Sequence, residues 1–285
     1  MSDEPVSLEL QEVRGPSVLG GGRRRFFDLL WLLSLNEFRK TYFGSALGYV
    51  WSLARPLMLF AVLYVVFTKI LRFGSDEIAH YPVLLLFNVV LFGYFQEATG
   101  GAVGSVLAQE AIVRKTQFPR LVIPLSPALI ALFTLGLNMV AVLVFILAAG
   151  ITPMWTWLLF PLVLLPLLVL TAGLSMLLAA LNVRFRDVGI IWVVVAQALF
   201  YASPILYPIT TAAIPGTLHD ILLINPLTPI LTQARHWIIE PSAPGAVAAA
   251  GGWLHLLPSI AVFVAVCALG VWVFKREAPK IAELL

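Results

Sequence analysis

Few side chains in this sequence are of the types that bind metals or attack substrates. The four histidines never stand four residues apart, so no helix would carry two imidazoles on one face in the usual metal-binding spacing. A single cysteine excludes an intrachain disulfide framework, a cysteine-based zinc site and an iron–sulfur cluster. We therefore expect no metal site and no catalytic residue. The histidines and the cysteine are His80, His219, His236, His255 and Cys267.

The motifs that bind nucleotide phosphates or build hydrolytic sites are also missing from the sequence. A G-x-x-x-x-G-K-[ST] loop needs Gly followed by Lys, and this dipeptide does not occur. Neither H-E-x-x-H nor G-x-S-x-G occurs. Charges are too sparse in the apolar segments to form a proton relay. If the chain carries out an energy-requiring process, another chain must supply the energy.

The composition is that of a membrane protein. The 285 residues are 60% hydrophobic and 12% charged, whereas a soluble domain carries about 25% charge. A helix needs about 20 apolar residues to cross the hydrocarbon core, and six stretches reach that length. The sequence therefore predicts an all-α integral membrane protein and excludes a soluble globular enzyme. The expected spans are about 46–71, 82–107, 121–149, 156–181, 189–207 and 256–274.

The basic residues predict the orientation of these spans. Fourteen of the 18 Lys and Arg residues lie on one side and three on the other, with Arg55 inside the first span. Lys and Arg are retained in the cytoplasm, so we expect both termini there, which agrees with an even number of spans. Residues 1–22 are polar and unlike a signal peptide. The expected organisation is a six-helix domain at 44–274 between cytoplasmic tails at 1–22 and 275–285.

Two further segments differ from simple spans. Residues 23–43 are basic at both ends with an apolar centre too short to cross, which predicts an interfacial amphipathic helix on the inner leaflet. The alternative is a frayed start of the first span. Residues 208–255 are long for a loop and combine six prolines with apolar patches. This mixture predicts short outer re-entrant helices between spans five and six.

Five segments, in order along the chain, carry a family resemblance. The first, 37–67, contains a basic and aromatic cluster followed by Leu-Gly, Trp and Pro. Together the five resemble the permeases of type-2 ABC exporters of the polysaccharide-export branch. Arg55 and the tail at 1–22 depart from the family pattern. The other four segments are RKTQFPRLVIPLS at 114–126, LNVRFRDV at 181–188, SPILYP at 203–208 and NPLTPILTQAR at 225–235.

The resemblance implies a half-transporter in a bacterial inner membrane. A homodimer of this chain would assemble with two copies of a separate ATPase subunit, which would bind ATP and Mg, and no cofactor is expected on this chain. The cargo would be a glycan on polyprenyl pyrophosphate, such as an O-antigen, a teichoic acid or a galactan. An excess of Arg over Lys, 13 to 5, is typical of a GC-rich genome and favours the galactan by association. No nucleic acid is expected as a partner.

The same resemblance assigns roles to the cytoplasmic segments. Residues 23–43 would be the gate helix and 108–120 the coupling helix that docks on the ATPase. The alternative for the coupling segment is ordinary positive charge of an inner loop. For a second inner loop, two roles are equally open: docking on the ATPase, or ordinary positive charge that keeps the loop in the cytoplasm. The docking candidates are Glu110, Arg114, Lys115, Phe118 and Pro119 in the first loop and Arg184, Arg186 and Asp187 in the second.

Aromatic side chains of the first span could form the wall of a glycan conduit, because sugar rings present apolar C–H faces that stack on aromatic rings. Their offsets of 7, 11, 4 and 3 return to one helical face. The alternative is aromatic rings that face lipid or pack helices. On span five, Trp192 and Tyr201 are candidates that do not share one face. The aromatic candidates of the first span, to which the offsets refer, are Tyr42, Tyr49, Phe60, Tyr64 and Phe67.

Arg55 and Glu97 are the two charges inside the expected spans. Each lies roughly 13 to 15 Å from the inner end of its span at 1.5 Å per residue. Unpaired, each would cost about 3 kcal/mol or more at that depth. Similar depth and opposite sign predict a structural Arg55–Glu97 pair. The alternative is that Arg55 faces the conduit and steers a pyrophosphate headgroup.

Three functions remain open at this point. The first is the membrane subunit of an ATP-driven exporter of lipid-linked polysaccharide. The second is a type-2 ABC permease for a small drug or lipid. The third is a membrane-embedded glycosyl- or acyltransferase, which would need carboxylates or histidine gathered near a membrane border. The outer acidic residues are scattered along the sequence, so we expect a transport permease and not an enzyme.

Overall fold

The computed structural model describes residues 22–43, 48–70, 78, 80–109, 119–210 and 214–278. Every regular element in these ranges is a helix, which confirms the all-α prediction. The long helices are α1 (Gly22–Phe43), α2 (Gly48–Tyr64), α3 (Tyr81–Ala108), α5 (Val122–Ala148), α6 (Phe160–Arg184), α7 (Val188–Tyr201) and α11 (Leu257–Glu277). The shorter elements are η1 (Val65–Ile70), η2 (Trp155–Leu159), α8 (Gly216–Ile224), α9 (Leu227–Ile238), α10 (Ala246–Ala249) and η3 (Trp253–Leu256).

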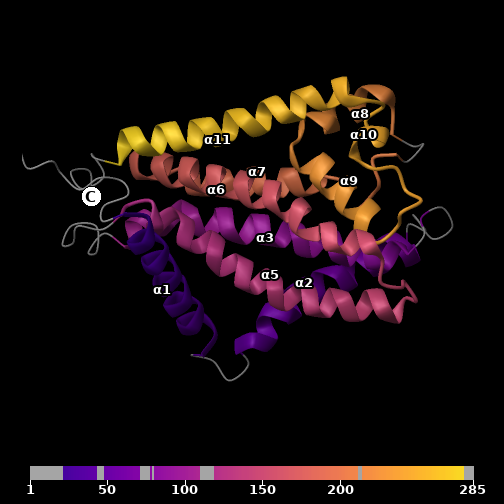
Figure 1. The fold of residues 1–285 in the computed structure, drawn as a ribbon, viewed down its shortest axis with the longest axis horizontal. Coiled ribbons are helices and arrows are strands. Elements are labelled where there is room, and N and C mark those ends of the chain that lie inside the picture. The colour runs from indigo at the N-terminus through magenta and orange to yellow at the C-terminus, as the bar shows by residue number, and fades with distance from the viewer. Residues whose placement is uncertain are drawn as a thin grey trace, which may run out of the picture.

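Helix α3 is the centre of the structure. It lies between α5 and α6, and α11 lies along the outer side of α6 (Figure 1). Leu85, Phe87, Leu91 and Phe95 of α3 are at most 1% exposed, so this helix is buried on most of its circumference. Helix α3 therefore forms the frame against which the other helices are positioned.

Helices α6 and α11 approach so closely that only glycine fits between them. A Cβ atom placed on Gly270 would collide with the backbone carbonyl of Gly173. One placed on Gly173 would meet the Cα of Cys267 at 2.9 Å. Small residues at such crossings let helix backbones pack without a driving force from water. The last long helix is thus held on α6 by close packing of the two backbones.

Within the described ranges, five helical segments are long and apolar enough to cross a membrane. They begin at Val50, Tyr81, Val122, Trp155 and Trp253. The fifth expected span, 189–207, is shorter than predicted, because α7 ends at Tyr201 after 14 residues. At 1.5 Å per residue this helix is roughly 21 Å long, against about 30 Å for the hydrocarbon core. Its apolar run continues through Pro204 and Pro208, where the backbone is not helical.

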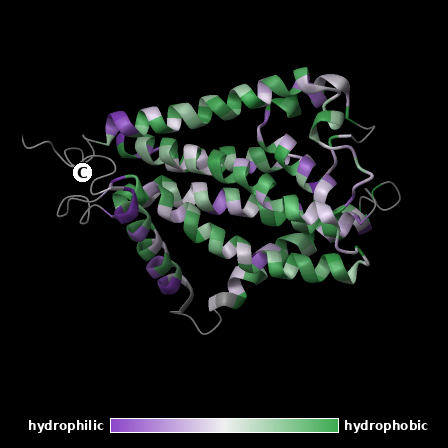
Figure 2. Cartoon of the chain, in the orientation of Figure 1, coloured by the Kyte–Doolittle hydropathy of each residue, from purple (hydrophilic) through white to green (hydrophobic). Residues whose placement is uncertain are grey.

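Helix α1 packs against α5 and runs obliquely to the other helices (Figure 1). The Ser34 hydroxyl donates to the backbone oxygen of Ser126 at 3.3 Å. The rings of Trp31 and Phe38 both pack edge-on against Phe133 of α5. Hydrophilic residues gather on α1 and at the end of α11, whereas the middles of α5, α6 and α11 are hydrophobic (Figure 2). The short helices α8 to α10 lie at the opposite end of the molecule from the C-terminus.

Candidate functional site

Two helices that contact α3 are left largely uncovered by the rest of the chain. On α2 the side chains of Val50, Trp51, Met58 and Val62 are exposed, and they are apolar. On α7 a longer run of apolar side chains is exposed. Both helices contact α3, and we call their exposed residues, together with those of α3 described next, the open face. The exposed residues of α7 include Ile190, Ile191, Val193, Val194 and Tyr201.

The exposed part of α3 includes a strip made of one amide side chain and two glycines. Gln96, Gly100 and Gly104 are exposed and recur every four residues, so they lie on one helical face. Among the described residues nothing lies within 4 Å of a Cβ atom placed on either glycine. The strip is bordered on one side by α7, where Trp192 Nε1 donates to Thr99 Oγ1 at 3.2 Å. Gln96 was not singled out in the sequence, although its spacing from the two glycines was readable there.

On the other border of this strip lie the two intramembrane charges. Arg55 of α2 and Glu97 of α3 are both exposed in the single chain. The Thr134 hydroxyl of α5 donates to Glu97 Oε1 at 3.3 Å. Among the described residues no ion pair within 4 Å joins the two charges. A charge at this depth cannot be left against acyl chains without a cost of about 3 kcal/mol or more.

The aromatic candidates of the first span do not share one continuous helix, which corrects the offset argument. Tyr42 belongs to α1, whereas Phe60 and Tyr64 belong to α2 and Phe67 to the π-helical turn η1. A break between two helices and a π turn both change the angle between residues, so offsets of 100° per residue do not apply across them. The side chains of Tyr42 and Tyr49 lie outside the described part of the structure.

The described aromatics take different positions. Phe60 is buried, stacks on Tyr64 with ring centres 5.8 Å apart and meets Phe145 of α5 edge-on. Tyr64 and Phe67 are partly buried beside the core. On α7, Trp192 is buried against Phe95 and Thr99 of α3, so its ring positions α7. Tyr201 is 56% exposed, and its ring packs edge-on against Phe200.

Four of the eight expected docking residues belong to the described part of the structure. Glu110, Arg114, Lys115 and Phe118 fall outside the described residues. Pro119 is buried, and its carbonyl accepts the backbone N–H of Val122 at 2.9 Å, where α5 begins. In the second loop Arg184, Arg186 and Asp187 are all exposed, and the Arg184 guanidinium lies over the Phe185 ring.

The non-helical segment 202–210 that follows α7 is held by side chains from elsewhere in the fold. Asn88 Nδ2 donates to the carbonyl of Pro204 at 3.0 Å, and the Tyr81 hydroxyl donates to that of Leu206 at 2.8 Å. Asn225 Nδ2 donates to the carbonyl of Ala202 at 3.2 Å. Irregular backbone at membrane depth is tolerated only when its polar groups are satisfied in this way. The contacts from Asn88 and Tyr81 join positions more than 100 residues apart, so local sequence patterns could not predict them.

The sequence was compared with known proteins. The family described as ABC-2 type transporter matches residues 28–238. This chain belongs to the ABC-2 transporter family. The match begins within α1 and runs through the end of α9, so it includes the open face, and it confirms the resemblance carried by the five sequence segments. The chain is accordingly a multi-pass transport permease, not an enzyme.

Curated relatives of this ABC-2 chain are permeases of glycan export. The O-antigen export system permease protein RfbA of Klebsiella pneumoniae is 30% identical over 210 residues, which cover 73% of this chain and 79% of the relative. The protein of the same name from Myxococcus xanthus is 28% identical over 89% of this chain and 94% of its own length. The polysialic acid transport protein KpsM of Escherichia coli is 22% identical over 73% of this chain and 80% of the relative.

Proposed function

We propose that this chain is the membrane subunit of an ATP-driven exporter that moves a lipid-linked polysaccharide outward across a bacterial inner membrane. The names of the curated relatives favour this cargo over a small drug or lipid, and favour transport over glycosyl or acyl transfer. The observation that carries the proposal is the open face of α2, α3 and α7, where Arg55, Glu97 and Gln96 are exposed.

A second copy of the chain covers this face in our proposal. Charged and amide side chains at membrane depth are unfavourable against lipid, so the face needs a protein partner or a water-filled path in front of it. A homodimer whose subunits meet through α2 and α7 supplies the protein partner and the water-filled path, because the two α3 strips then face each other across a conduit. The glycan moves along that conduit by weak, repeated stacking on exposed aromatics such as Tyr201, with Tyr42, Tyr49, Tyr64 and Phe67 as further candidates. Phe60 is buried inside the single chain and is not expected to contact the glycan.

Two copies of a separate ATPase subunit bind the inner side, with ATP and Mg on those subunits. The docking elements are the loop at 108–120 and the loop that carries Arg184, Arg186 and Asp187. This orientation places both termini in the cytoplasm, α1 along the inner leaflet as a gate helix, and α8 to α10 as re-entrant helices on the outer side. In this arrangement α7 with its non-helical continuation completes six crossings. The exposed arginines of α1 and the lysine and arginine at the end of α11 support it.

Co-expression with a P-loop ATPase encoded beside this gene tests the proposal. We expect the two chains to purify together and ATP hydrolysis to require both of them. Cells depleted of this chain should accumulate polyprenyl-linked glycan on the cytoplasmic side. An ATPase subunit with a substituted P-loop lysine is the matched control, because it should assemble but fail to export. Export that continues in depleted cells would contradict the proposal.

A further inference from the structure

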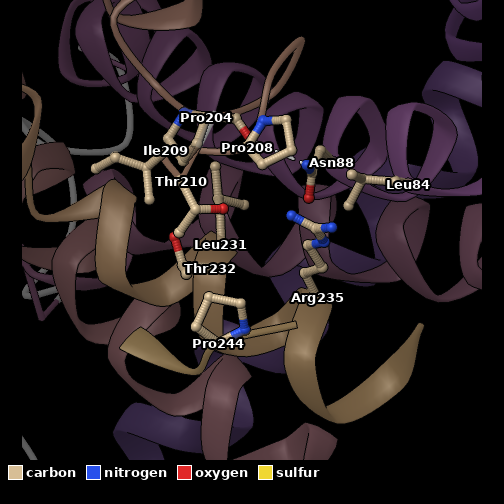
Figure 3. A pocket seen from close by; sticks show the side chains of 10 residues that line it. All are labelled: Leu84, Asn88, Pro204, Pro208, Ile209, Thr210, Leu231, Thr232, Arg235 and Pro244. Atoms are coloured by element: carbon tan, nitrogen blue, oxygen red, sulfur yellow. Dashed lines mark hydrogen bonds between the residues drawn. The ribbon is translucent and has the colours of Figure 1, made fainter. Parts of the chain in front are cut away.

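A small pocket lies at the outer end of the chain between α3, the 202–210 segment and α9 (Figure 3). Its volume is about 10 Å³, which is room for one group the size of a water molecule. Thr210 and Pro244 at its rim are exposed, so the pocket opens to the outer side of the molecule. The residues that decide its chemistry are Asn88, Thr232 and Arg235.

Asn88 brings an unsatisfied acceptor to this pocket. The side chain is 2% exposed, and its Nδ2 donates to the Pro204 carbonyl at 3.0 Å. Among the described residues its Oδ1 has no hydrogen-bond partner. Figure 3 shows this oxygen directed toward the guanidinium of Arg235. A buried acceptor without a donor costs roughly 1–3 kcal/mol, so the site favours a ligand that can donate a proton.

Arg235 offers hydrogen-bond donors to the pocket, while Glu240 neutralises its charge. Its Nε and Nη2 both donate to Glu240 Oε2, at 3.2 and 2.5 Å. The two side chains are 12% and 17% exposed, so the charges largely cancel each other inside the protein. A guanidinium has five N–H donors, and these two bonds use two of them. The Arg235 side of the pocket therefore retains donor capacity toward a neutral ligand.

These groups select one class of ligand. An anion is disfavoured because it would place an acceptor next to the acceptor Asn88 Oδ1. A cation is disfavoured because it would lie next to the positively charged Arg235 guanidinium. An apolar group would leave the buried Oδ1 unsatisfied. We propose that this pocket binds one neutral hydroxyl group, which donates to Asn88 Oδ1 and accepts from Arg235. Thr232 adds no competing donor there, because its hydroxyl already donates to the Thr228 carbonyl at 2.8 Å.

The hydroxyl can come from two sources, a solvent water or a sugar hydroxyl of an emerging glycan. The site stands on the contacts above, and only the sugar source rests on the proposed export function. In either case the bound hydroxyl links α3 to α9 beside the segment that Asn88 and Tyr81 already hold. The outer ends of three elements are then joined by hydrogen bonds around one small ligand.

High-resolution electron cryo-microscopy of the full complex with its ATPase, in lipid nanodiscs, tests the site. One map is recorded without glycan and one with lipid-linked glycan from export-deficient cells. We expect density within hydrogen-bond distance of both Asn88 Oδ1 and Arg235. An isolated peak in both maps identifies water, and a peak continuous with a sugar ring identifies the glycan source. An empty pocket, a direct Asn88–Arg235 hydrogen bond or an anion in the pocket would overturn the proposal.

Two matched variants test the role of Asn88. Asn88→Leu and Tyr81→Phe each remove one hydrogen bond from α3 to the 202–210 segment, but only the first removes Oδ1. The peak should disappear in Asn88→Leu and persist in Tyr81→Phe. A peak that persists in Asn88→Leu, or is lost in Tyr81→Phe, would overturn the proposal. If Asn88→Leu does not assemble, the wild-type maps decide, and ATP-dependent export by the wild type tests the proposed function separately.

Discussion

Tyr81 at the start of α3 donates a hydrogen bond to the carbonyl of Leu206 at 2.8 Å, across 125 residues of sequence. Both residues are at most 3% exposed. The bond satisfies a carbonyl in the non-helical stretch after α7, where no helix partner is available. It therefore allows an apolar run to leave the helical conformation inside the protein and fixes where that run ends.

Tyr81→Phe should lower stability, because it leaves the buried Leu206 carbonyl without its donor. The expected loss is about 1–3 kcal/mol. The matched control is Tyr207→Phe, which also removes a 2.8 Å bond to a carbonyl, that of Tyr201, but at a more exposed site. Thermal unfolding of the purified chain in detergent should show a clearly lower midpoint for Tyr81→Phe. Equal shifts for the two variants would contradict this account of the 202–210 segment.

Gly270→Ala should disrupt the packing of α11 on α6, because the added methyl group collides with the carbonyl of Gly173. We expect a loss of roughly 1–3 kcal/mol, as for other overpacked sites. Gly136→Ala on α5 is the control, since no described residue lies within 4 Å of its added Cβ. That change should be neutral or stabilising by about 0.5–1 kcal/mol. The comparison is made by thermal unfolding, and an unchanged Gly270→Ala midpoint would refute the close approach.

Glu240→Gln should destabilise the outer end, because it leaves Arg235 without its counter-charge at a site where both are mostly buried. The loss should reach up to about 3 kcal/mol. Glu37→Gln is the control, since Lys40 and Glu37 are 72% and 38% exposed, and such surface pairs are worth about 0–1 kcal/mol. Limited proteolysis of the loop after α9 should be faster in Glu240→Gln alone. Equal proteolysis rates would contradict a stabilising role for the pair.

Arg55→Glu and Glu97→Arg should each reduce assembly, because each places two like charges near one another at membrane depth. The double variant restores opposite signs and should recover much of the lost complex. Fluorescence-detected size-exclusion chromatography of membrane extracts measures this directly. A double variant that assembles no better than the single variants would contradict an electrostatic interaction between the two residues.

Hydropathy predicted the long spans well, because each needs only a run of apolar residues of sufficient length. At 189–207 the apolar run is longer than the helix, which ends at Tyr201, because apolarity does not show where a helix stops before Pro204 and the donors that satisfy the following backbone are distant in sequence. The offset argument for Tyr42 failed because it assumes one uninterrupted helix. Arg55 and Glu97 were found because charge inside an apolar run is visible in any sequence, whereas Gln96 needed the structure to show that α3 leaves that face uncovered.

Cysteine accessibility of the α3 strip tests the central claim most directly. In a Cys267→Ser background, Gly100→Cys is compared with Leu269→Cys, an exposed position on α11 also eight residues from the inner end of its helix. A charged thiol reagent applied from the cytoplasmic side should label Gly100→Cys, and lipid-linked glycan should slow that labelling, while Leu269→Cys stays unlabelled. If Gly100→Cys reacts only with membrane-soluble reagents, the strip faces lipid and does not line a conduit.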